Sequence, residues 1–466
     1  MATVVSHGAA QVVTGSCHLL ELDDGTRILI DCGMFQGKEE ERNDAPFGFN
    51  PASIDALVLT HAHLDHVGRL PKLFKEGFRG TIYATPATKD LAEVILLDSA
   101  KIMNEDYRTR YKKAQRRGKE GEEPPPLYDE EEVKRLFKHP WHLVRYGQAY
   151  PLGNTATVTF HNAGHILGSA FVAIDYIRHG QTRRVVFSGD IGNDTDRVMP
   201  PLERCDYAHH LFVESTYGDR EHQSWEASIA EFKRIIVETL NNWGNVIIPS
   251  FAVERTQQLL CILKDMHDAG ELPECRIFLD SPMAQKATEL YRRYASELSE
   301  HCRRTKQNTG AMFRFDNLVY TRSVEESKRI NDVHYRAVII AGSGMCTGGR
   351  ILHHFKNRLW NRKNALIFVG YQAEGTLGRA IVDGQRLVKI YGEELLIQAS
   401  VHTVNGFSAH ADRSAILRWI GAIRELEHIF LIHGEYDKQT LLRQVLKTHL
   451  GIPTHIVKPE EKIFLT

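Results

Sequence analysis

The chain has 466 residues, of which 42% are hydrophobic and 25% charged, and its formal net charge is −1. This length predicts two or three domains, and the near-zero charge excludes a generally basic protein that coats nucleic acid. No apolar run reaches the roughly 18 residues of a spanning helix, and the N-terminus lacks a signal-peptide pattern. The seven cysteines are scattered without a CxxC pair, which predicts reduced thiols. We therefore expect a cytoplasmic protein with no membrane partner.

The first half of the chain is rich in short strands. β-rich runs alternate with turn signals through the first hundred residues, and strands return at 155–160 and 183–188. Between them, the polar stretch from about 103 to 140 is expected to hold a helix end, a solvated loop and a second helix starting near Asp129.

The pattern changes after about residue 206. Apolar strands at 245–249, 276–279 and 337–341 alternate with amphipathic segments such as 256–266. This alternation predicts a parallel α/β sheet covered by helices. The chain then closes with a buried strand at 428–432 and a helix after it.

The motif HxHxDH at residues 61–66 directly follows a strand pattern. It places four ligand-type side chains within six residues of one loop, where they can serve two adjacent metal ions. His165 in GHILGS, Asp190 in SGDIG and His433 in IHGE each follow a strand pattern in the same way. Together these side chains provide the ligands of a dinuclear site.

We expect the ligands to be divided between two zinc ions. His61, His63 and His165 hold the first ion, Asp65, His66 and His433 hold the second, and Asp190 bridges them, with Asp31 lying behind. Two adjacent ions can activate water at neutral pH and stabilise an oxyanion, which favours hydrolysis. A nucleophilic serine or cysteine is disfavoured, because the chain shows no nucleophile elbow and no cysteine with an obvious base partner.

This arrangement of ligands resembles the metallo-β-lactamase superfamily across the whole chain. Glu214 in FVESTYG, His410 in GFSAHAD and His433 look like motifs A, B and C of its β-CASP nucleases. The resemblance implies an αββα sandwich formed by residues 1–206 and 396–466, with an α/β β-CASP domain inserted at 207–395. It also implies an active site in the cleft between the two domains.

The resemblance further implies a zinc-dependent ribonuclease of RNA processing or decay that hydrolyses single-stranded RNA. Endonuclease activity is expected, and 5′-to-3′ exonuclease activity is left open. The expected catalytic residues are Asp65, Glu214 and His410. Glu214 would pair with His410 and keep it protonated, so that His410 can protonate the leaving oxygen of the phosphodiester.

Three turns in the inserted segment are expected to bind RNA phosphates. Glycine-rich turns that open a helix present backbone N–H groups to anions, although such turns are also common for geometric reasons. All three turns have the form found in β-CASP proteins. The residues expected at phosphates are Ser250, Arg255, Ser343, Gly344, Arg350, Thr376 and Arg379.

Three alternatives stay open. A DNA nuclease could use the same two metals, but His433 at motif C is typical of members that act on RNA, whereas DNA-specific members tend to carry valine. A hydrolase of small thioesters, lactams or sulfate esters would not need the large insert. A metal-free RNA-binding scaffold is disfavoured by the seven intact ligand positions. The sequence does not determine the oligomeric state, and a homodimer is one arrangement that it allows.

Overall fold

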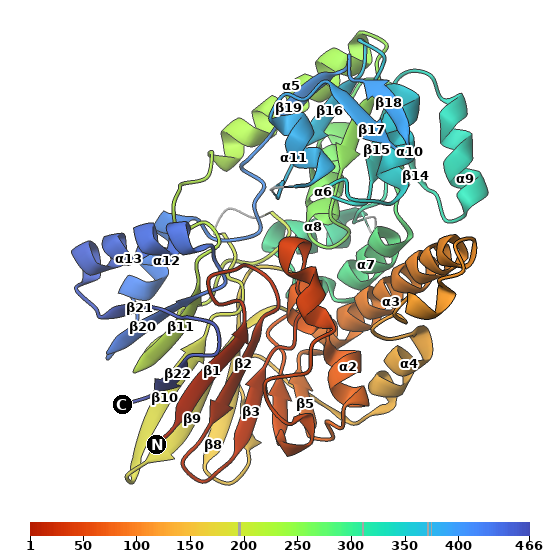
Figure 1. The fold of residues 1–466 in the computed structure, drawn as a ribbon. Coiled ribbons are helices and arrows are strands. Elements are labelled where there is room, and N and C mark those ends of the chain that lie inside the picture. Colours follow the sequence, from red (N-terminus) through yellow and green to blue (C-terminus); the bar gives the residue numbers. More distant parts are fainter. Residues whose placement is uncertain (194–196, 310–311, 371, 374) are drawn as a thin grey trace. The chain divides into compact units, whose positions relative to one another are not determined.

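The computed structural model describes residues 1–193, 197–309, 312–370, 372–373 and 375–466. The chain divides into two compact units, of which the first consists of three separate stretches (Figure 1). Unit 1 comprises Met1–Gly192, Leu202–Glu221 and His410–Thr466, and unit 2 comprises Asn193–Pro201 and His222–Ala409. The domain limits expected from the sequence, between 206 and 207 and between 395 and 396, stay a prediction.

Unit 1 contains two seven-stranded sheets. The first has the order β22-β1-β2-β3-β4-β5-β6, in which β3 to β6 are parallel. Its strands are β1 (Thr3–Gly8), β2 (Cys17–Glu21), β3 (Arg27–Ile30), β4 (Ala56–Val58), β5 (Thr81–Ala84), β6 (Trp141–Leu143) and β22 (Lys462–Phe464).

The second sheet of unit 1 has the order β21-β20-β11-β10-β9-β8-β7. Its strands β10, β11, β20 and β21 are parallel, whereas β7 to β10 form an antiparallel meander. The strands are β7 (Ala149–Leu152), β8 (Ala156–Asn162), β9 (Ala170–Arg178), β10 (Gln181–Phe187), β11 (His210–Glu214), β20 (His428–Ile432) and β21 (Thr454–Ile456).

The core of unit 1 lies between these sheets. Leu20 and Ile30 of the first sheet pack with Phe160, Phe187 and Phe212 of the second in one buried cluster. The strands place apolar residues on their inward face, as the period-2 pattern of their sequences predicts.

Helices cover the outer faces of the two sheets (Figure 1). Ile416 and Trp419 of α12 and Leu442 of α13 pack on the outer face of the second sheet, against Phe171 and Val213. The αββα sandwich expected from the sequence is therefore confirmed. The helices of unit 1 are α1 (Leu64–Val67), α2 (Leu70–Lys75), α3 (Pro86–Gln115), α4 (Glu130–Lys138), α12 (Arg413–Gly421) and α13 (Tyr436–Leu450).

The polar stretch after residue 103 is more helical than expected. Helix α3 continues to Gln115, and its last turns are exposed. Helix α4 begins after Asp129, whose side chain accepts a hydrogen bond from the backbone N–H of Glu132 in a capping box. The expected second helix is thus confirmed, and the solvated loop is shorter than the composition indicated.

Unit 2 is built around a six-stranded parallel sheet with the order β14-β13-β15-β12-β16-β19. Its strands are β12 (Val246–Pro249), β13 (Arg276–Asp280), β14 (Leu318–Tyr320), β15 (Ala337–Ala341), β16 (Ala365–Phe368) and β19 (Ser400–Thr403). A hairpin of β17 (Leu387–Ile390) and β18 (Glu393–Leu396) packs beside it. The predicted parallel α/β sheet is confirmed.

The helices of unit 2 alternate with its strands, as parallel connections require. They are α5 (Trp225–Asn241), α6 (Arg255–Asp268), α7 (Pro282–Arg293), α8 (Glu300–Thr309), α9 (Val324–Arg329), α10 (Arg350–Arg358) and α11 (Leu377–Val382). Among the helices of the described residues, none is both long and apolar enough to cross a bilayer.

Candidate metal centre

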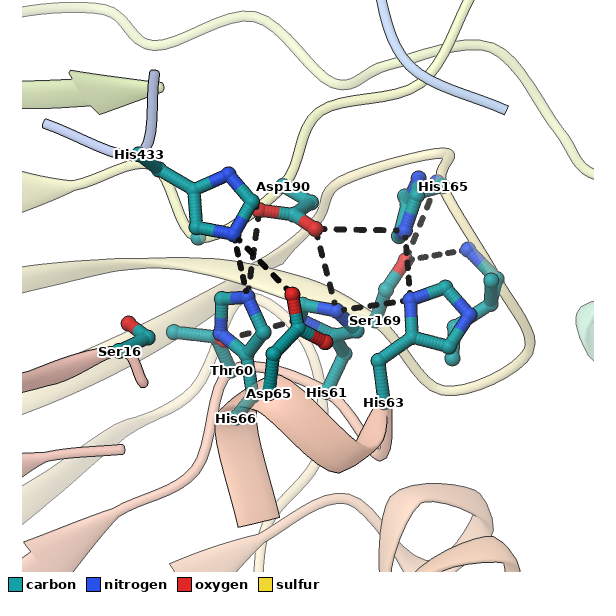
Figure 2. Close-up of polar contacts among 12 residues, drawn as sticks. Ser16, Thr60, His61, His63, Asp65, His66, His165, Ser169, Asp190 and His433 are labelled. Carbon is teal, nitrogen blue, oxygen red and sulfur yellow. Dashed lines mark hydrogen bonds and ion pairs between the residues drawn. The ribbon is translucent and has the colours of Figure 1, made fainter. Parts of the chain in front are cut away.

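The expected metal ligands of unit 1 come from loops at the carboxyl ends of strands. His61 follows β4, His165 follows β8, Asp190 follows β10 and His433 follows β20. Because β4 belongs to one sheet and the other three strands to the second, the centre draws ligands from both sheets (Figure 2). Carboxyl ends of strands are where α/β folds place functional side chains.

The HxHxDH loop turns directly into helix α1. His63 precedes the first residue of α1, so Asp65 and His66 lie in its first turn. The chain at Gly33 passes close to this turn, where an added Cβ atom would lie 1.5 Å from the backbone oxygen of Asp65. Only glycine fits this approach, which keeps the strand end beside the helix.

Three imidazoles and one carboxylate form the first ligand cluster. His63 Nδ1 lies 3.2 Å from His61 Nε2 and 3.1 Å from His165 Nε2. Asp190 Oδ2 lies 3.4 Å from His61 Nε2 and 3.6 Å from His165 Nε2. Zinc bonds of 2.0–2.1 Å in a tetrahedron place ligand nitrogens about 3.4 Å apart. The spacing in this cluster therefore suits one ion.

The second cluster consists of Asp65, His66 and His433. His433 Nε2 lies 3.2 Å from His66 Nε2 and 3.4 Å from Asp65 Oδ2. Asp190 reaches this cluster with its other oxygen, since Oδ1 lies 3.4 Å from His66 Nε2 and 3.5 Å from His433 Nδ1. One carboxylate oxygen of Asp190 thus faces each cluster.

The fit of a metal to these residues is supported by the carboxylate of Asp190, which faces both clusters. Asp190 Oδ1 is buried and accepts no hydrogen bond from the described residues. Such an oxygen is costly unless a cation or another donor compensates it. Since imidazole and carboxylate are ligands that zinc accepts, the donor set matches this ion.

The pKa values of the histidines agree with a role as metal ligands. Burial lowers the pKa of His63 to about 3, and burial also holds the pKa of His61 and of His165 below the usual value, so these rings are neutral. Burial opposes the charge on His66, but the carboxylates of Asp190 and Asp31 outweigh it and raise its pKa. Metal binding at the second cluster therefore displaces a proton.

Asp31 orients His66 from behind. Its Oδ2 lies 2.7 Å from His66 Nδ1 and accepts a 2.8 Å hydrogen bond from the hydroxyl of Thr60, while its Oδ1 accepts the Thr60 N–H. Asp31 has φ +58°, a backbone conformation that is strained for a non-glycine residue. These contacts direct Nε2 of His66 toward His433 and Asp190.

We predict that Asp31→Asn weakens zinc binding at the second cluster by about 10–100-fold, the range measured for partners of metal-bound histidines. Both carboxylate oxygens of Asp31 make contacts with Thr60 or His66, whereas the asparagine of the variant has only one oxygen that can accept hydrogen bonds. Competition with a chromophoric chelator measures the affinity, and Asp24→Asn, in an exposed turn, is the matched control. An unchanged affinity in Asp31→Asn would contradict the assigned role.

Two threonines support the ligands without having been singled out in the sequence. Thr60 Oγ1 lies 3.1 Å from His61 Nδ1, and Thr216 Oγ1 lies 3.1 Å from His433 Nδ1. Both residues adjoin the motifs, since Thr60 precedes His61 and Thr216 belongs to FVESTYG. A search for hydroxyl residues beside ligand histidines would have found them.

The buried Glu214 pairs with the partly exposed His410 next to the ligands. His410 Nδ1 lies 3.0 Å from Glu214 Oε2 and 3.9 Å from Asp190 Oδ2, and the rings of His410 and His165 are 4.6 Å apart at their centroids. Glu214 also accepts a 2.7 Å hydrogen bond from the backbone N–H of Ile191. This second contact fixes the carboxylate beside the strand end that carries Asp190.

The three turns expected to bind phosphates meet at the carboxyl edge of the sheet of unit 2. The backbone N–H of Ser250 donates to Ala341 O, and the side chain of Gln372 donates to Gly344 O. A Cβ atom at Gly344 would lie 2.7 Å from the ring of Phe251. Residues 371 and 374 of the third turn lie outside the described residues.

Most of the expected phosphate-binding side chains are held by internal contacts. Ser250 lies 3.0 Å from the Thr256 hydroxyl, and Ser343 accepts the backbone N–H of Thr347. Thr376 caps α11 by accepting the N–H of Arg379. The hydroxyls of these three residues therefore shape the turns.

The three arginines differ in their surroundings. Arg255 is buried and donates to Gln258, and Arg350 forms a 2.6 Å ion pair with the buried Asp280. Arg379 pairs with Asp383 and keeps 39% of its side chain exposed. The assignment of all three to RNA phosphates stays a prediction, and Arg379 is the best placed to meet one.

The fold and the two ligand clusters define a metal-dependent hydrolase with a two-sheet sandwich. Residues 10–238 match the metallo-beta-lactamase superfamily, residues 256–381 match the Beta-Casp domain, and residues 394–457 match the Zn-dependent metallo-hydrolase RNA specificity domain. The chain therefore belongs to the β-CASP family of the metallo-β-lactamase superfamily.

Its curated relatives include bacterial and archaeal proteins. Ribonuclease TTHA0252 of Thermus thermophilus is 43% identical over 95% of both chains. Transcription termination factor FttA of Methanocaldococcus jannaschii is 34% identical over 96% of this chain and 70% of its own length. FttA of Thermococcus kodakarensis is also 34% identical, over 94% of this chain and 68% of its own length.

Proposed function

We propose that the protein is a two-zinc ribonuclease that hydrolyses phosphodiester bonds of single-stranded RNA in RNA processing or decay. The observation that carries this proposal is the pair of ligand clusters joined by Asp190, with the Glu214–His410 pair beside it. The name of the ribonuclease relative supports RNA as the substrate. We propose endonuclease activity, with 5′-to-3′ exonuclease activity as an alternative.

The chain supplies an acid for the leaving group. When bound, two zinc ions would lower the pKa of water and neutralise negative charge that develops on phosphoryl oxygens. As the oxygen of water bonds to phosphorus and the bond to the leaving oxygen breaks, that oxygen needs a proton. His410 would donate it from Nε2, since Nδ1 is held by Glu214. Glu214 would stabilise the positive charge on His410 before the transfer.

Arg379 is predicted to contact an RNA phosphate. Replacing it with glutamine should weaken RNA binding and reduce the slope of log K against log salt by about 0.7, the loss of one phosphate contact with a single strand. Fluorescence anisotropy at several salt concentrations measures the slope. Arg304→Gln is the control, because Arg304 is an exposed, Glu300-paired arginine of the same unit. An unchanged slope in Arg379→Gln would remove Arg379 from the interface.

A comparison of substrates tests the proposal. The metal-replete protein is incubated with a 5′-labelled single-stranded RNA, its DNA counterpart and a panel of thioester, lactam and sulfate ester substrates, beside an Asp65→Ala plus His66→Ala variant. We expect the wild type alone to cut RNA, with internal products if it is an endonuclease. Cleavage of DNA, or of a small ester without RNA cleavage, would favour the corresponding alternative hydrolase.

We also propose a cytoplasmic location, a homodimer and the domain limits after residues 206 and 395. The seven cysteines are free and buried, which suits a reducing compartment.

An exposed aromatic group supports the homodimer. Trp243 and Tyr335 are each more than half exposed and contact one another, and Arg336 stacks on Trp243. Aromatic and arginine side chains are enriched at protein interfaces. Sedimentation equilibrium measures the oligomeric state.

A further inference from the structure

A second group of ligand-type residues lies at the starting ends of β11 and β20. These two parallel strands are neighbours (Figure 1). His210 of β11 is paired in register with His428 of β20. Their rings are nearly parallel, with an interplanar angle of 8° and centroids 5.9 Å apart. The other ends of the same strands carry Glu214 and lead to His433, so this group is separate from the catalytic centre.

His210 is buried without a polar partner. The residue is 0% exposed, and neither Nδ1 nor Nε2 has a hydrogen bond to the described residues. Nδ1 of His428 is likewise buried and without a hydrogen bond. A buried imidazole that satisfies neither nitrogen costs free energy, and an ion or a water molecule is the usual explanation.

Glu427 adds a carboxylate to the two histidines. One ligand atom from each of His210, Glu427 and His428 can be chosen so that all three lie within 4.8 Å of one another. Two imidazoles and one carboxylate form a set that zinc accepts, with the remaining position open to water. We propose that His210, His428 and Glu427 hold a third divalent transition-metal ion of the zinc type.

The protonation of His210 agrees with this role. Burial lowers the pKa of His210 to about 4, aided by the nearby charge of Arg183, so the ring is neutral at pH 7 and presents a lone pair. Binding needs rotation of the stacked rings about χ2, a torsion that is broad for histidine. Each ring can then turn one nitrogen toward a common ion.

The surroundings of the site set its affinity. Arg183 of β10 donates two hydrogen bonds to the carboxylate of Glu427, which orients it as carboxylate ligands of metals commonly are. Its positive charge also opposes a cation, so this site binds zinc more weakly than the catalytic clusters. His209 and Glu425, whose side chains are 4.0 Å apart, also lie near the strand ends, and Arg183 contacts the C-terminal Thr466 and Tyr176.

Metal counting tests the site. After equilibrium dialysis against excess zinc and gel filtration, mass spectrometry of the folded protein should find three zinc ions per wild-type chain and two in His210→Phe. His449→Phe, which changes an exposed histidine of the same unit, should keep three. Asp65→Ala plus His66→Ala should keep the ion at His210, which distinguishes this site from the proposed catalytic centre.

A second variant guards against misfolding of His210→Phe. Glu427→Gln, at a partly exposed residue, should lower the affinity of the third ion at least tenfold, because the charge of the carboxylate ligand is removed. Added zinc should also raise the melting temperature of the wild type more than that of His210→Phe. Two zinc ions in the saturated wild type, or the same count in the wild type and a folded His210→Phe, would overturn the proposal.

Discussion

Replacing Asp190 with asparagine is expected to lower kcat/KM for RNA cleavage by at least about 10³-fold, a larger loss than the 10–100-fold typical of partners behind the ligands. The two carboxylate oxygens of Asp190 each face one ligand cluster. An asparagine offers one oxygen and no charge, and its NH₂ group would be turned toward imidazole nitrogens. The variant should therefore fail to hold two metal ions at the two clusters.

Cleavage of a labelled RNA and zinc content are measured on the same preparation of Asp190→Asn. Asp175→Asn is the matched control, because Asp175 belongs to the same sheet but forms an ion pair with Arg184 outside the centre. The control should retain both zinc ions and the wild-type rate. An Asp190→Asn variant that binds two zinc ions and cleaves RNA within tenfold of the wild type would contradict a bridging role.

Replacing His410 with alanine is expected to lower kcat by about 10²–10⁴-fold, the range for a lost general acid, while both zinc ions stay bound. Burial alone would lower the pKa of His410, but the carboxylate of Glu214 reverses this effect and raises it to about 9. His410 is thus protonated at neutral pH. A role as acid predicts that activity falls as the pH rises through the pKa of His410.

The effect of Glu214 on the pKa of His410 provides a second test of the role of His410 as an acid. Glu214→Gln keeps an acceptor for the N–H of Ile191 but removes the charge, so the pKa of His410 drops and the fall in kcat moves to lower pH. The measurement is kcat against pH for the wild type and Glu214→Gln. His161→Gln is the control, since His161 forms a similar pair with Glu203 elsewhere in unit 1. Identical pH profiles of kcat for the wild type and Glu214→Gln would show that Glu214 does not set the pKa of the catalytic acid.

The candidate metal ligands could be found in the sequence because each depends on a local pattern. An apolar strand that ends shortly before His61, Asp190 or His433 places the side chain at the carboxyl end of that strand, and the structure brings these ends together. The order of strands across two sheets, which sets which ligands meet, is not local. That order and the distances around Asp190 came only from the structure.

Residues that act through tertiary contacts were harder to predict. Arg350 follows a glycine turn that suits phosphate, yet its guanidinium pairs with Asp280, which lies 70 positions earlier in the chain. The pairing of His210 with His428 spans a still longer separation and follows no motif. Helix α3 was underestimated because its last turns are mostly polar and exposed, so they resemble a solvated loop in composition.

RNA cleavage is proposed to depend on two metal ions held by the seven candidate ligands. The most direct test is to strip the protein of metal, add zinc in steps, and follow the RNA cleavage rate against the zinc bound per chain. We predict negligible cleavage below one ion and a steep rise as the second ion binds. Cleavage by the metal-free protein, or no cleavage of RNA with both clusters filled, would contradict a two-metal ribonuclease.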